Sequence, residues 1–301
     1  MPLEHDVFKF LSKHLIEYKT RLKTADFVSL KIGGESDIII FPKTIDEFCA
    51  ILNWVSQHKY KYFILNKGTN TYFKDSFYNG IIICTNNLND VEIDGNFLIS
   101  ECGTSLFKCC EIAREHELSG LEFAYGIPGG IGGALFMNAS AYEKSISQIV
   151  FQSVAYDMDS RKVVKISFAD HKFGEKNSVF QEKNLILLKT FMCLKNENAS
   201  NINEIMEKNL ALRLLKQPCD FPNAGSIFKR PKNNYASRLI DKCGLKGFEI
   251  GGAAVSKKHA GFIVNNCNAT ASDVNKLINY IKKQVKSKFD IDLEKEVIYV
   301  E

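Results

Sequence analysis

Short apolar runs and amphipathic stretches alternate along the first two thirds of the chain. Apolar runs bounded by turn residues predict strands at 36–41, 62–65, 80–84, 90–93, 97–101, 149–157, 162–167 and 185–194. Helical spacing of apolar residues predicts helices over 1–20, over the segment after Thr44, over 105–116 and over 202–215. This alternation is typical of a mixed α/β protein.

The last predicted helix has the clearest pattern. Ser272 is a candidate N-cap, and one apolar stripe follows it, formed by Val274, Leu277, Ile278, Ile281, Val285 and Phe289. The lysines between these positions are expected to face solvent. The polar segment 195–204 is the best linker candidate. The pattern therefore predicts three parts, at 1–83, 84–200 and 201–301.

Length and charge narrow the class of protein. A chain of 301 residues can bury a sizeable core without disulfides or a structural metal. A net charge of +4 is too small to indicate a nucleic-acid binder, and it suits an anionic small-molecule substrate. Charges interrupt any apolar run within 1–20, and no later segment has 18 consecutive apolar residues. We therefore expect no signal peptide and no membrane span, and a cytoplasmic protein.

Cysteine usage is also informative. The nine cysteines are odd in number, with no CxxC pair and no His/Cys cluster at ligand spacing. We expect reduced thiols that act as small hydrophobic residues, and no metal site.

A polar turn directly follows the predicted strand at 62–65. Its residues are Asn66, Lys67, Gly68, Thr69 and Asn70. Glycine and asparagine tolerate positive φ, so successive N–H groups here can converge on a phosphate oxygen. An ordinary surface loop is the alternative.

A much denser signal is the glycine-rich stretch 126–133, with five glycines and a proline in eight residues. Such a stretch loses much conformational entropy on folding unless the backbone must approach something closely. It is neither a Walker A loop nor a GxGxxG turn. A pyrophosphate cradle is the favoured interpretation, and a tight internal turn is the alternative.

The run GLEFAYGIPGGIGGALFMNASAY (120–142) resembles the flavin-binding segment of the MurB reductases, the UDP-N-acetylenolpyruvoylglucosamine reductases. Further similar segments follow the family's order: 31–34 with 36–37, the turn 65–70, PNAGSIFK (222–229), 239–247, 250–253, 255–265 and LEKEV (293–297). The likeness covers the chain from about residue 25 to its end, and the compact third part resembles the shorter subtype.

The resemblance implies a fold and a reaction. The fold is α/β (α+β), with a two-subdomain FAD-binding part of the vanillyl-alcohol-oxidase (PCMH) type and a C-terminal α+β substrate-binding domain. The implied reaction is ping-pong: NADPH reduces FAD, and flavin N5 then delivers hydride to the enolpyruvyl ether of UDP-N-acetylglucosamine, giving UDP-N-acetylmuramate. The partner is a small UDP-sugar, with neither nucleic acid nor membrane, and the protein is expected to be a monomer.

The resemblance also carries roles onto individual residues. Ser226 stands where the family has its proton donor, and Glu296 where it has a carboxyl near the C-terminus. Glu294 lies two residues earlier on the same face of a strand, so the choice between the two glutamates rests on the family pattern. The candidates for substrate binding are Lys229, Asn265 and Arg213. The candidates for cofactor binding are Lys67, Gly68, Thr69, Asn70, Tyr125, Gly126, Ile127, Pro128, Gly129, Ile131, Gly132, Gly133, Asn138 and Ala139.

Several positions depart from the family pattern. Lys176 stands where the family has the arginine that meets the substrate carboxylate, and lysine keeps the charge but loses the bidentate fork. Asn66 and Lys67 stand where glycine is common.

These departures leave alternatives open. The chain could be an FAD-binding relative whose reductase activity is lost or altered. Another flavin oxidoreductase on the same scaffold, or a non-catalytic flavin-binding protein, is also compatible with the motifs.

Overall fold

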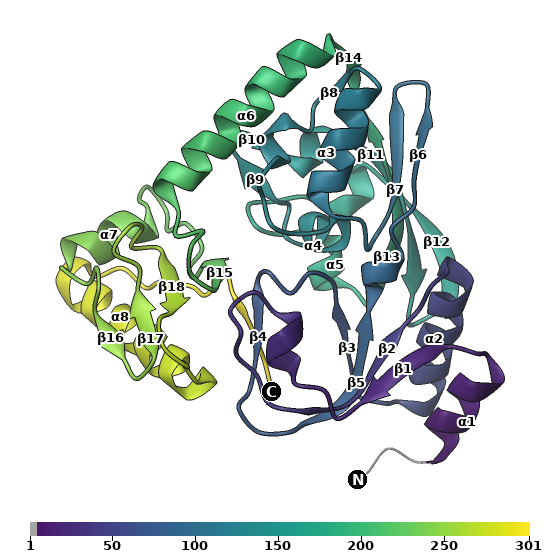
Figure 1. Ribbon diagram of the computed structural model, residues 1–301, viewed down its shortest axis with the longest axis horizontal. Coiled ribbons are helices and arrows are strands. Elements are labelled where there is room, and N and C mark those ends of the chain that lie inside the picture. The colour runs from purple at the N-terminus through teal and green to yellow at the C-terminus, as the bar shows by residue number, and fades with distance from the viewer. Residues whose placement is uncertain (1–4) are drawn as a thin grey trace. The chain divides into compact units, whose positions relative to one another are not determined.

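The computed structural model describes residues 5–301 and divides into two compact units (Figure 1). The large unit contains the described part of 1–20 together with 38–67 and 80–212. The small unit contains 21–37, 68–79 and 213–301. The chain therefore contributes two early segments to the unit that holds its C-terminal third.

A five-stranded antiparallel sheet forms one half of the large unit. In sheet order its strands are β12 (Lys162–Ser167), β11 (Val150–Asp157), β13 (Leu185–Cys193), β7 (Phe97–Glu101) and β6 (Val91–Asp94). The helices α3 (Leu106–Glu115), α4 (Ile131–Phe136) and α5 (Val179–Glu182) pack against β7 and β13. Figure 1 shows these helices on the same side of the sheet. Two short ladders complete this half: β8 (Leu118–Ser119) with β14 (Lys195–Asn196), and β9 (Ser140–Ala141) with β10 (Lys144–Ser145).

A four-stranded sheet with two helices forms the other half. Its strands, in order, are β1 (Glu17–Thr20), β2 (Ser36–Phe41), β5 (Tyr78–Cys84) and β3 (Tyr62–Leu65), and its helices are α1 (His5–Lys13) and α2 (Ile45–His58). Alternate residues of β2 and β5, such as Ile38 and Ile83, enter the same hydrophobic core as residues of the five-stranded sheet. One core therefore spans the predicted boundary near residue 84, and the three-part division stays a prediction.

The small unit is an α+β structure. Its sheet has the order β15 (Asn223–Ser226), β18 (Phe262–Asn265), β17 (Ala253–Val255) and β16 (Glu249–Ile250), and its helices are α7 (Ala236–Lys242) and α8 (Ala271–Phe289). A parallel pair joins β4 (Thr71–Phe73) to β19 (Ile298–Val300). Leu30, Ile32 and Tyr72 enter this core, which explains why the two early segments belong to the unit.

The remaining elements are one long helix and five 3₁₀ turns. The helix α6 (Ala199–Lys216) contributes residues to both units. The 3₁₀ turns are η1 (Thr24–Phe27), η2 (Thr85–Asn87), η3 (Glu122–Ala124), η4 (Ile146–Gln148) and η5 (Ala169–His171).

Helix caps show where local sequence is decisive. The Thr44 side chain accepts the Glu47 N–H at the start of α2, as the pattern predicted. The apolar stripe of α8 is buried as expected, but the predicted cap at Ser272 is wrong. Thr270 is the N-cap and forms a capping box with Asp273. The chain therefore enters the helix two residues earlier than the apolar pattern indicated.

Two other predictions need correction. The predicted helix over 1–20 ends at Lys13, because residues 17–20 pair with β2 as β1; residues 1–4 lie outside the described part. The predicted linker 195–204 is largely ordered, since β14 occupies its first two residues and α6 begins at Ala199. Its polar residues are solvent-facing positions of regular structure, which composition alone does not distinguish from a loop.

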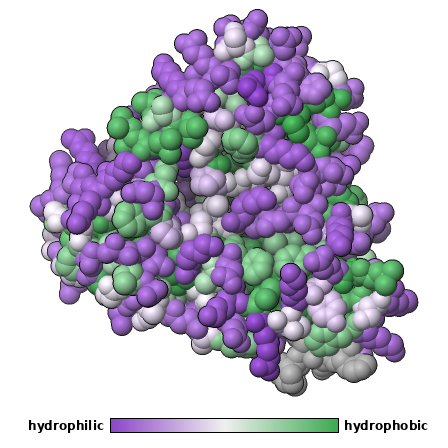
Figure 2. Space-filling model, viewed as in Figure 1, coloured by the Kyte–Doolittle hydropathy of each residue, from purple (hydrophilic) through white to green (hydrophobic). Residues whose placement is uncertain are grey.

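The surface is largely hydrophilic in the view of Figure 2, with separate apolar patches. Within residues 5–301, no helix is long and apolar enough to cross a membrane. The same residues contain no group of His, Cys, Asp or Glu that could hold a metal ion, and all nine cysteines are free thiols.

Candidate active site

Ser226 lies at the end of β15, in a turn fixed by its neighbours. The Asn223 carboxamide oxygen accepts the Gly225 N–H at 3.0 Å, and Gly225 has φ +73°, a conformation that favours glycine. The next residue is held in turn, because the Ile227 N–H donates to the Gly261 carbonyl at 3.0 Å. Ser226 is half-buried, and no group among residues 5–301 hydrogen-bonds to its hydroxyl.

Glu296 lies next to this turn through backbone pairing. Its N–H donates to the carbonyl of Ile227, the residue after Ser226, at 2.8 Å. Its carbonyl accepts the Asn70 side-chain amide at 3.2 Å, and the Ile298 N–H donates to the Asn70 carbonyl at 2.9 Å. The small unit therefore joins the second half of the polar turn, β15 with Ser226 and the segment that carries Glu296. The predicted closing strand does not include Glu296, because β19 begins only at Ile298.

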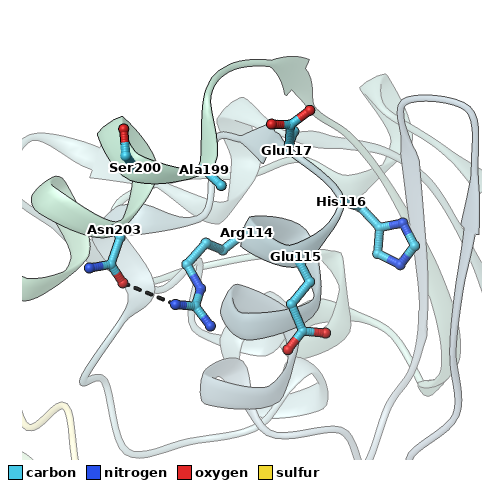
Figure 3. Close-up of a pocket in the computed structure, with 7 residues that line it drawn as sticks. All are labelled: Arg114, Glu115, His116, Glu117, Ala199, Ser200 and Asn203. Carbon is cyan, nitrogen blue, oxygen red and sulfur yellow. Dashed lines mark hydrogen bonds between the residues drawn. The ribbon is translucent and has the colours of Figure 1, made fainter.

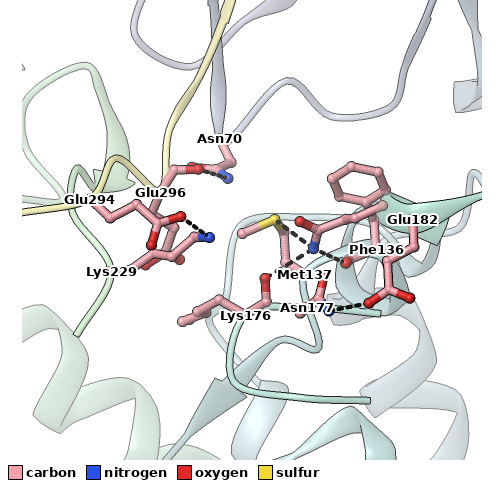
Figure 4. Close-up of polar contacts among 10 residues, drawn as sticks. Asn70, Phe136, Met137, Lys176, Asn177, Glu182, Lys229, Glu294 and Glu296 are labelled. Atoms are coloured by element: carbon pink, nitrogen blue, oxygen red, sulfur yellow. Dashed lines mark hydrogen bonds and ion pairs between the residues drawn. The ribbon is translucent and has the colours of Figure 1, made fainter. Parts of the chain in front are cut away.

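Glu294 and Glu296 have different surroundings (Figure 4). Glu294 forms an ion pair with Lys229 at 2.5 Å, and its side chain is 70% exposed. The Lys229 N–H also donates to the Glu294 carbonyl at 2.9 Å. Glu294 is thus the anionic neighbour of Lys229, whereas Glu296 is half-buried.

Gly68 shows why the polar turn needs a glycine. Its φ is +61°, and an added Cβ would lie 2.3 Å from the Phe27 carbonyl oxygen. The Gly68 carbonyl accepts the Ser29 N–H at 3.0 Å, while the Ser29 hydroxyl donates to the Asn223 carbonyl at 2.6 Å. The segment around Ser29 therefore connects the turn to β15, a contact that the sequence pattern does not predict because 194 residues separate its partners.

The signature glycines at 33 and 34 are explained by packing. An added Cβ would lie 2.1 Å from the Thr24 hydroxyl at Gly33 and 2.4 Å from the Asp75 carbonyl oxygen at Gly34. The packing of the small unit therefore leaves no room for a side chain at either position.

In the large unit, the second half of the glycine-rich stretch is a helix. Ile131, Gly132 and Gly133 form the first turn of α4, so the predicted loop ends at Gly130. The Ile131 and Gly132 N–H groups donate to the carbonyls of Thr104 and Cys102, at 2.9 and 2.8 Å. These two N–H groups bond within the protein, as the tight-turn interpretation of the stretch expects.

Gly129 and Gly130, the last two residues before α4, differ from Ile131 and Gly132 in the hydrogen bonding of their N–H groups. No group among residues 5–301 accepts a hydrogen bond from the N–H of Gly129 or Gly130. Successive backbone donors of this kind can bind an anionic oxygen. Tyr125, at the start of the loop, stacks on Phe107 with ring centroids 5.2 Å apart. Burial raises the pKa of its phenol, so the hydroxyl stays neutral at physiological pH.

Lys176 lies in a tight turn between η5 and α5. Its φ is +54°, and Gly174 and Asn177 form a β-bridge across the turn. The Gln181 side chain donates to the Lys176 carbonyl at 2.9 Å and to the Phe136 carbonyl at 2.6 Å. Side-chain amides therefore fasten this turn to the end of α4.

Asn138 supports the same turn. Its side-chain N–H donates to the Gly174 carbonyl at 2.8 Å, and its oxygen accepts the Ser147 N–H at 3.2 Å. The nitrogen and the oxygen of this carboxamide, which precedes Ala139 in the chain, both bond to other groups of the protein. Asn265 is similar, because its side chain bonds the Leu30 carbonyl and the Ala269 N–H. Both predicted contact residues have structural partners here, and their ligand roles stay predictions.

The other predicted residues are distributed by unit. Arg213 lies in the last turn of α6, in the small unit with Lys229. Lys67 and the stretch 125–133 lie in the large unit with Lys176.

A cavity of about 580 Å³ lies elsewhere in the large unit (Figure 3). Its walls are the end of α3 and the start of α6, including Arg114, His116 and Asn203. None of the predicted site residues lines it.

Comparison with known proteins gives two family matches. Residues 36–156 match an FAD binding domain, and residues 217–300 match the C-terminal domain of UDP-N-acetylenolpyruvoylglucosamine reductase. A reductase of that name from Caldicellulosiruptor bescii is 39% identical, covering 100% of this chain and 93% of its own. Its namesake from Caldanaerobacter subterraneus is 41% identical over 89% of each chain.

Solved structures agree in fold. The UDP-N-acetylenolpyruvylglucosamine reductase (MurB) of Thermus caldophilus aligns with a TM-score of 0.80 and 26% identity, covering 95% of this chain and 99% of that one. The berberine bridge enzyme aligns over 66% of this chain and 45% of its own, with a TM-score of 0.50 and 13% identity. The predicted FAD-binding fold of the PCMH type with an added C-terminal domain is confirmed.

Proposed function

Because the chain belongs to the UDP-N-acetylenolpyruvoylglucosamine reductase family, and is thus a flavin-dependent oxidoreductase, we propose a specific reaction for it. It reduces UDP-N-acetylglucosamine enolpyruvate to UDP-N-acetylmuramate, with FAD as cofactor and NADPH as electron donor. The observation that carries the proposal is the joining of Ser226, Glu296 and the turn 68–70 within one unit.

The residues of the large unit fit FAD. The N–H groups of Gly129 and Gly130 suit an anionic oxygen of the diphosphate, and Lys67 adds a positive charge at the end of β3. Tyr125 adds an aromatic face and a hydroxyl. When bound, FAD supplies the hydride chemistry, taking two electrons from NADPH and passing them to the enolpyruvyl double bond.

Ser226 then supplies the proton. A serine hydroxyl is a poor acid in water, so the role requires fixed placement against a strongly basic carbon. The Gly225 turn and the pairing with β18 provide that placement, and the hydroxyl has no partner among the described residues. Glu296, half-buried beside the same turn, polarises the substrate carboxylate or relays the proton.

Positive side chains bind the anionic substrate. Lys176 contacts the enolpyruvyl carboxylate as a monodentate clamp, in place of the family's arginine. Lys229 reaches a phosphate, exchanging part of its pairing with Glu294, while Arg213 and Asn265 make further polar contacts. In this proposal the protein works as a cytoplasmic monomer in peptidoglycan precursor synthesis.

An anaerobic titration followed by visible spectroscopy tests the proposal. NADPH should bleach the flavin bands, and UDP-N-acetylglucosamine enolpyruvate alone should then restore them. Bleaching without recovery would assign the chain to the FAD-binding relatives that have lost or altered the second half-reaction. A protein that takes up no flavin would overturn the proposal.

A further inference from the structure

We propose that Asn66 is a positioning residue of the flavin site, which fastens the end of β3 to the glycine-rich loop. The inference rests on the proposed binding of FAD. It concerns a residue that stands where glycine is common in the family, so its side-chain contacts are additional to the shared backbone motif.

The carboxamide nitrogen of Asn66 holds two segments. It donates to the Thr85 hydroxyl at 3.0 Å and to the Cys102 carbonyl at 3.1 Å. A carbonyl oxygen only accepts hydrogen bonds, so the contact with Cys102 identifies the nitrogen end of the carboxamide. The oxygen end must therefore face the other way.

The Cys102 carbonyl is shared with the glycine-rich stretch. It also accepts the Gly132 N–H at 2.8 Å. One carbonyl therefore receives the side chain that follows β3 and a backbone group of α4. The Asn66 side chain and the first turn of α4 thus meet at the Cys102 carbonyl, next to the loop at 126–130.

The oxygen end of Asn66 presses on the loop itself. It is buried, and no N–H or O–H among residues 5–301 donates to it. A Cβ added to Gly130 would lie only 2.0 Å from it, so the oxygen lies against the Gly130 Cα, in the arrangement of a weak C–H···O contact. The Thr104 carbonyl oxygen, 2.9 Å from the same added Cβ, closes the space from a second direction.

Asn66 and Gly130 therefore depend on one another. The asparagine side chain occupies the space that any larger residue at position 130 would need. In return it sets the position of Gly129 and Gly130, whose N–H groups are the proposed donors to the cofactor. Removing the carboxamide frees the loop to move and makes room for a Cβ at position 130.

The test measures FAD affinity and apoprotein stability separately. FAD is removed from the wild-type protein and from Asn66→Ala, Asn66→Asp, Gly130→Ala and the double variant Asn66→Ala/Gly130→Ala. Flavin fluorescence on adding FAD back gives Kd, and thermal denaturation of each apoprotein gives Tm. Asn66→Gly, which introduces the residue common in the family, replaces Asn66→Ala if that variant does not fold.

We expect Asn66→Ala to raise the Kd for FAD about tenfold, the effect of losing one or two net hydrogen bonds. Asn66→Asp, of the same shape, should raise it more, because a carboxylate oxygen would face the Cys102 carbonyl. Gly130→Ala should weaken binding strongly in the wild-type background and clearly less in the Asn66→Ala background. The control is Asn96→Ala, which removes a side-chain bond to the Leu194 carbonyl in the same unit and should leave Kd unchanged.

Three results would overturn the inference: an unchanged Kd for the Asn66 variants, a lower apoprotein Tm without any change in Kd, or an equal effect of Gly130→Ala in both backgrounds. A wild-type protein that binds no FAD would instead contradict the proposed function.

Discussion

The two units hold their proposed functional residues by different means. In the large unit, side-chain amides support the loops: Gln181 and Asn138 bond to the Lys176 turn, and the Asn66 carboxamide lies against Gly130 of the glycine-rich loop. In the small unit, backbone hydrogen bonds link the Ser226 and Glu296 segments, and the Asn223 and Asn70 carboxamides bond to the same backbone.

This difference predicts how each unit responds to substitution. The Ser226 side chain projects from a paired strand and can be replaced with little change in the strand, so variants of Ser226 are expected to report on chemistry. A loop that depends on individual carboxamides moves when one of them is removed. Variants in the large unit are therefore expected to change binding and stability together.

The largest effect is expected for Ser226→Ala. Loss of the proton donor should slow reoxidation of the reduced flavin by the enolpyruvyl substrate about 10³-fold, within the usual range for general acid catalysis. Flavin reduction by NADPH and the Tm should stay unchanged. Stopped-flow absorbance resolves the two half-reactions.

Ser237→Ala, a half-buried serine of the same unit, is the control for Ser226→Ala and should behave like the wild type. Full reoxidation by the Ser226 variant would remove this residue from the mechanism.

Glu296→Gln and Glu294→Gln form a matched pair two residues apart. We expect Glu296→Gln to slow the same half-reaction about 100-fold. Glu294→Gln should change the rate little and the free energy of unfolding by less than about 1 kcal/mol, because its ion pair with Lys229 is largely exposed. The reverse order of effects in the same assay would assign the functional carboxyl to Glu294.

Gly68→Ala and Gly95→Ala compare the two units at nearly equal φ, +61° and +58°. Both variants acquire the strain of a left-handed alanine, about 1 kcal/mol. Only at Gly68 does the Cβ meet backbone, whereas nothing lies within 4 Å at Gly95. Urea denaturation should show Gly68→Ala less stable by a further 2 kcal/mol or so; equal losses would contradict the close approach of Phe27.

Lys176→Arg tests the turn in the large unit. Arginine restores bidentate recognition of a carboxylate, so kcat/KM for the enolpyruvyl substrate should rise about tenfold, with NADPH reduction unchanged. Lys172→Arg, an exposed lysine four residues earlier, is the control. No gain for the Lys176 variant would argue against the clamp role.

The smallest expected effect is on the pH dependence of the protein's stability. His171 is buried beneath the Lys176 turn, between the Ser167 carbonyl and the Ser153 hydroxyl, and stacks on Phe173. Burial lowers its pKa below 6.5, so the unfolded state binds a proton that the folded state does not. Stability should therefore be complete above about pH 6.5 and fall as pH drops below it.

His171→Gln should flatten this pH dependence in urea titrations between pH 7 and pH 5. His259, whose pKa burial also lowers, provides the matching variant in the small unit. An unchanged slope in His171→Gln would show that other groups govern the acid response.

Local sequence predicted much of the regular structure correctly. The strands at 62–65, 97–101 and 162–167 lie where the apolar alternation placed them, and Thr44 and Ser105 cap their helices. These elements depend on the period of apolar residues and on caps within one turn, both of which are local. The motif at 120–142 identified the family for the same reason, since its information lies in one continuous run.

Contacts between distant segments could not be obtained in this way. β1 and β4 are too short to stand out, and they exist because β2 and β19 supply hydrogen-bond partners. The ion pair of Glu294 with Lys229, the bridge made by Ser29 and the contact of Asn66 with Gly130 all join residues far apart in the chain. Residue types and their spacing thus determine the elements and the chemistry available, whereas burial, pairing and close approach arise only when the folded chain brings remote groups within a few ångströms.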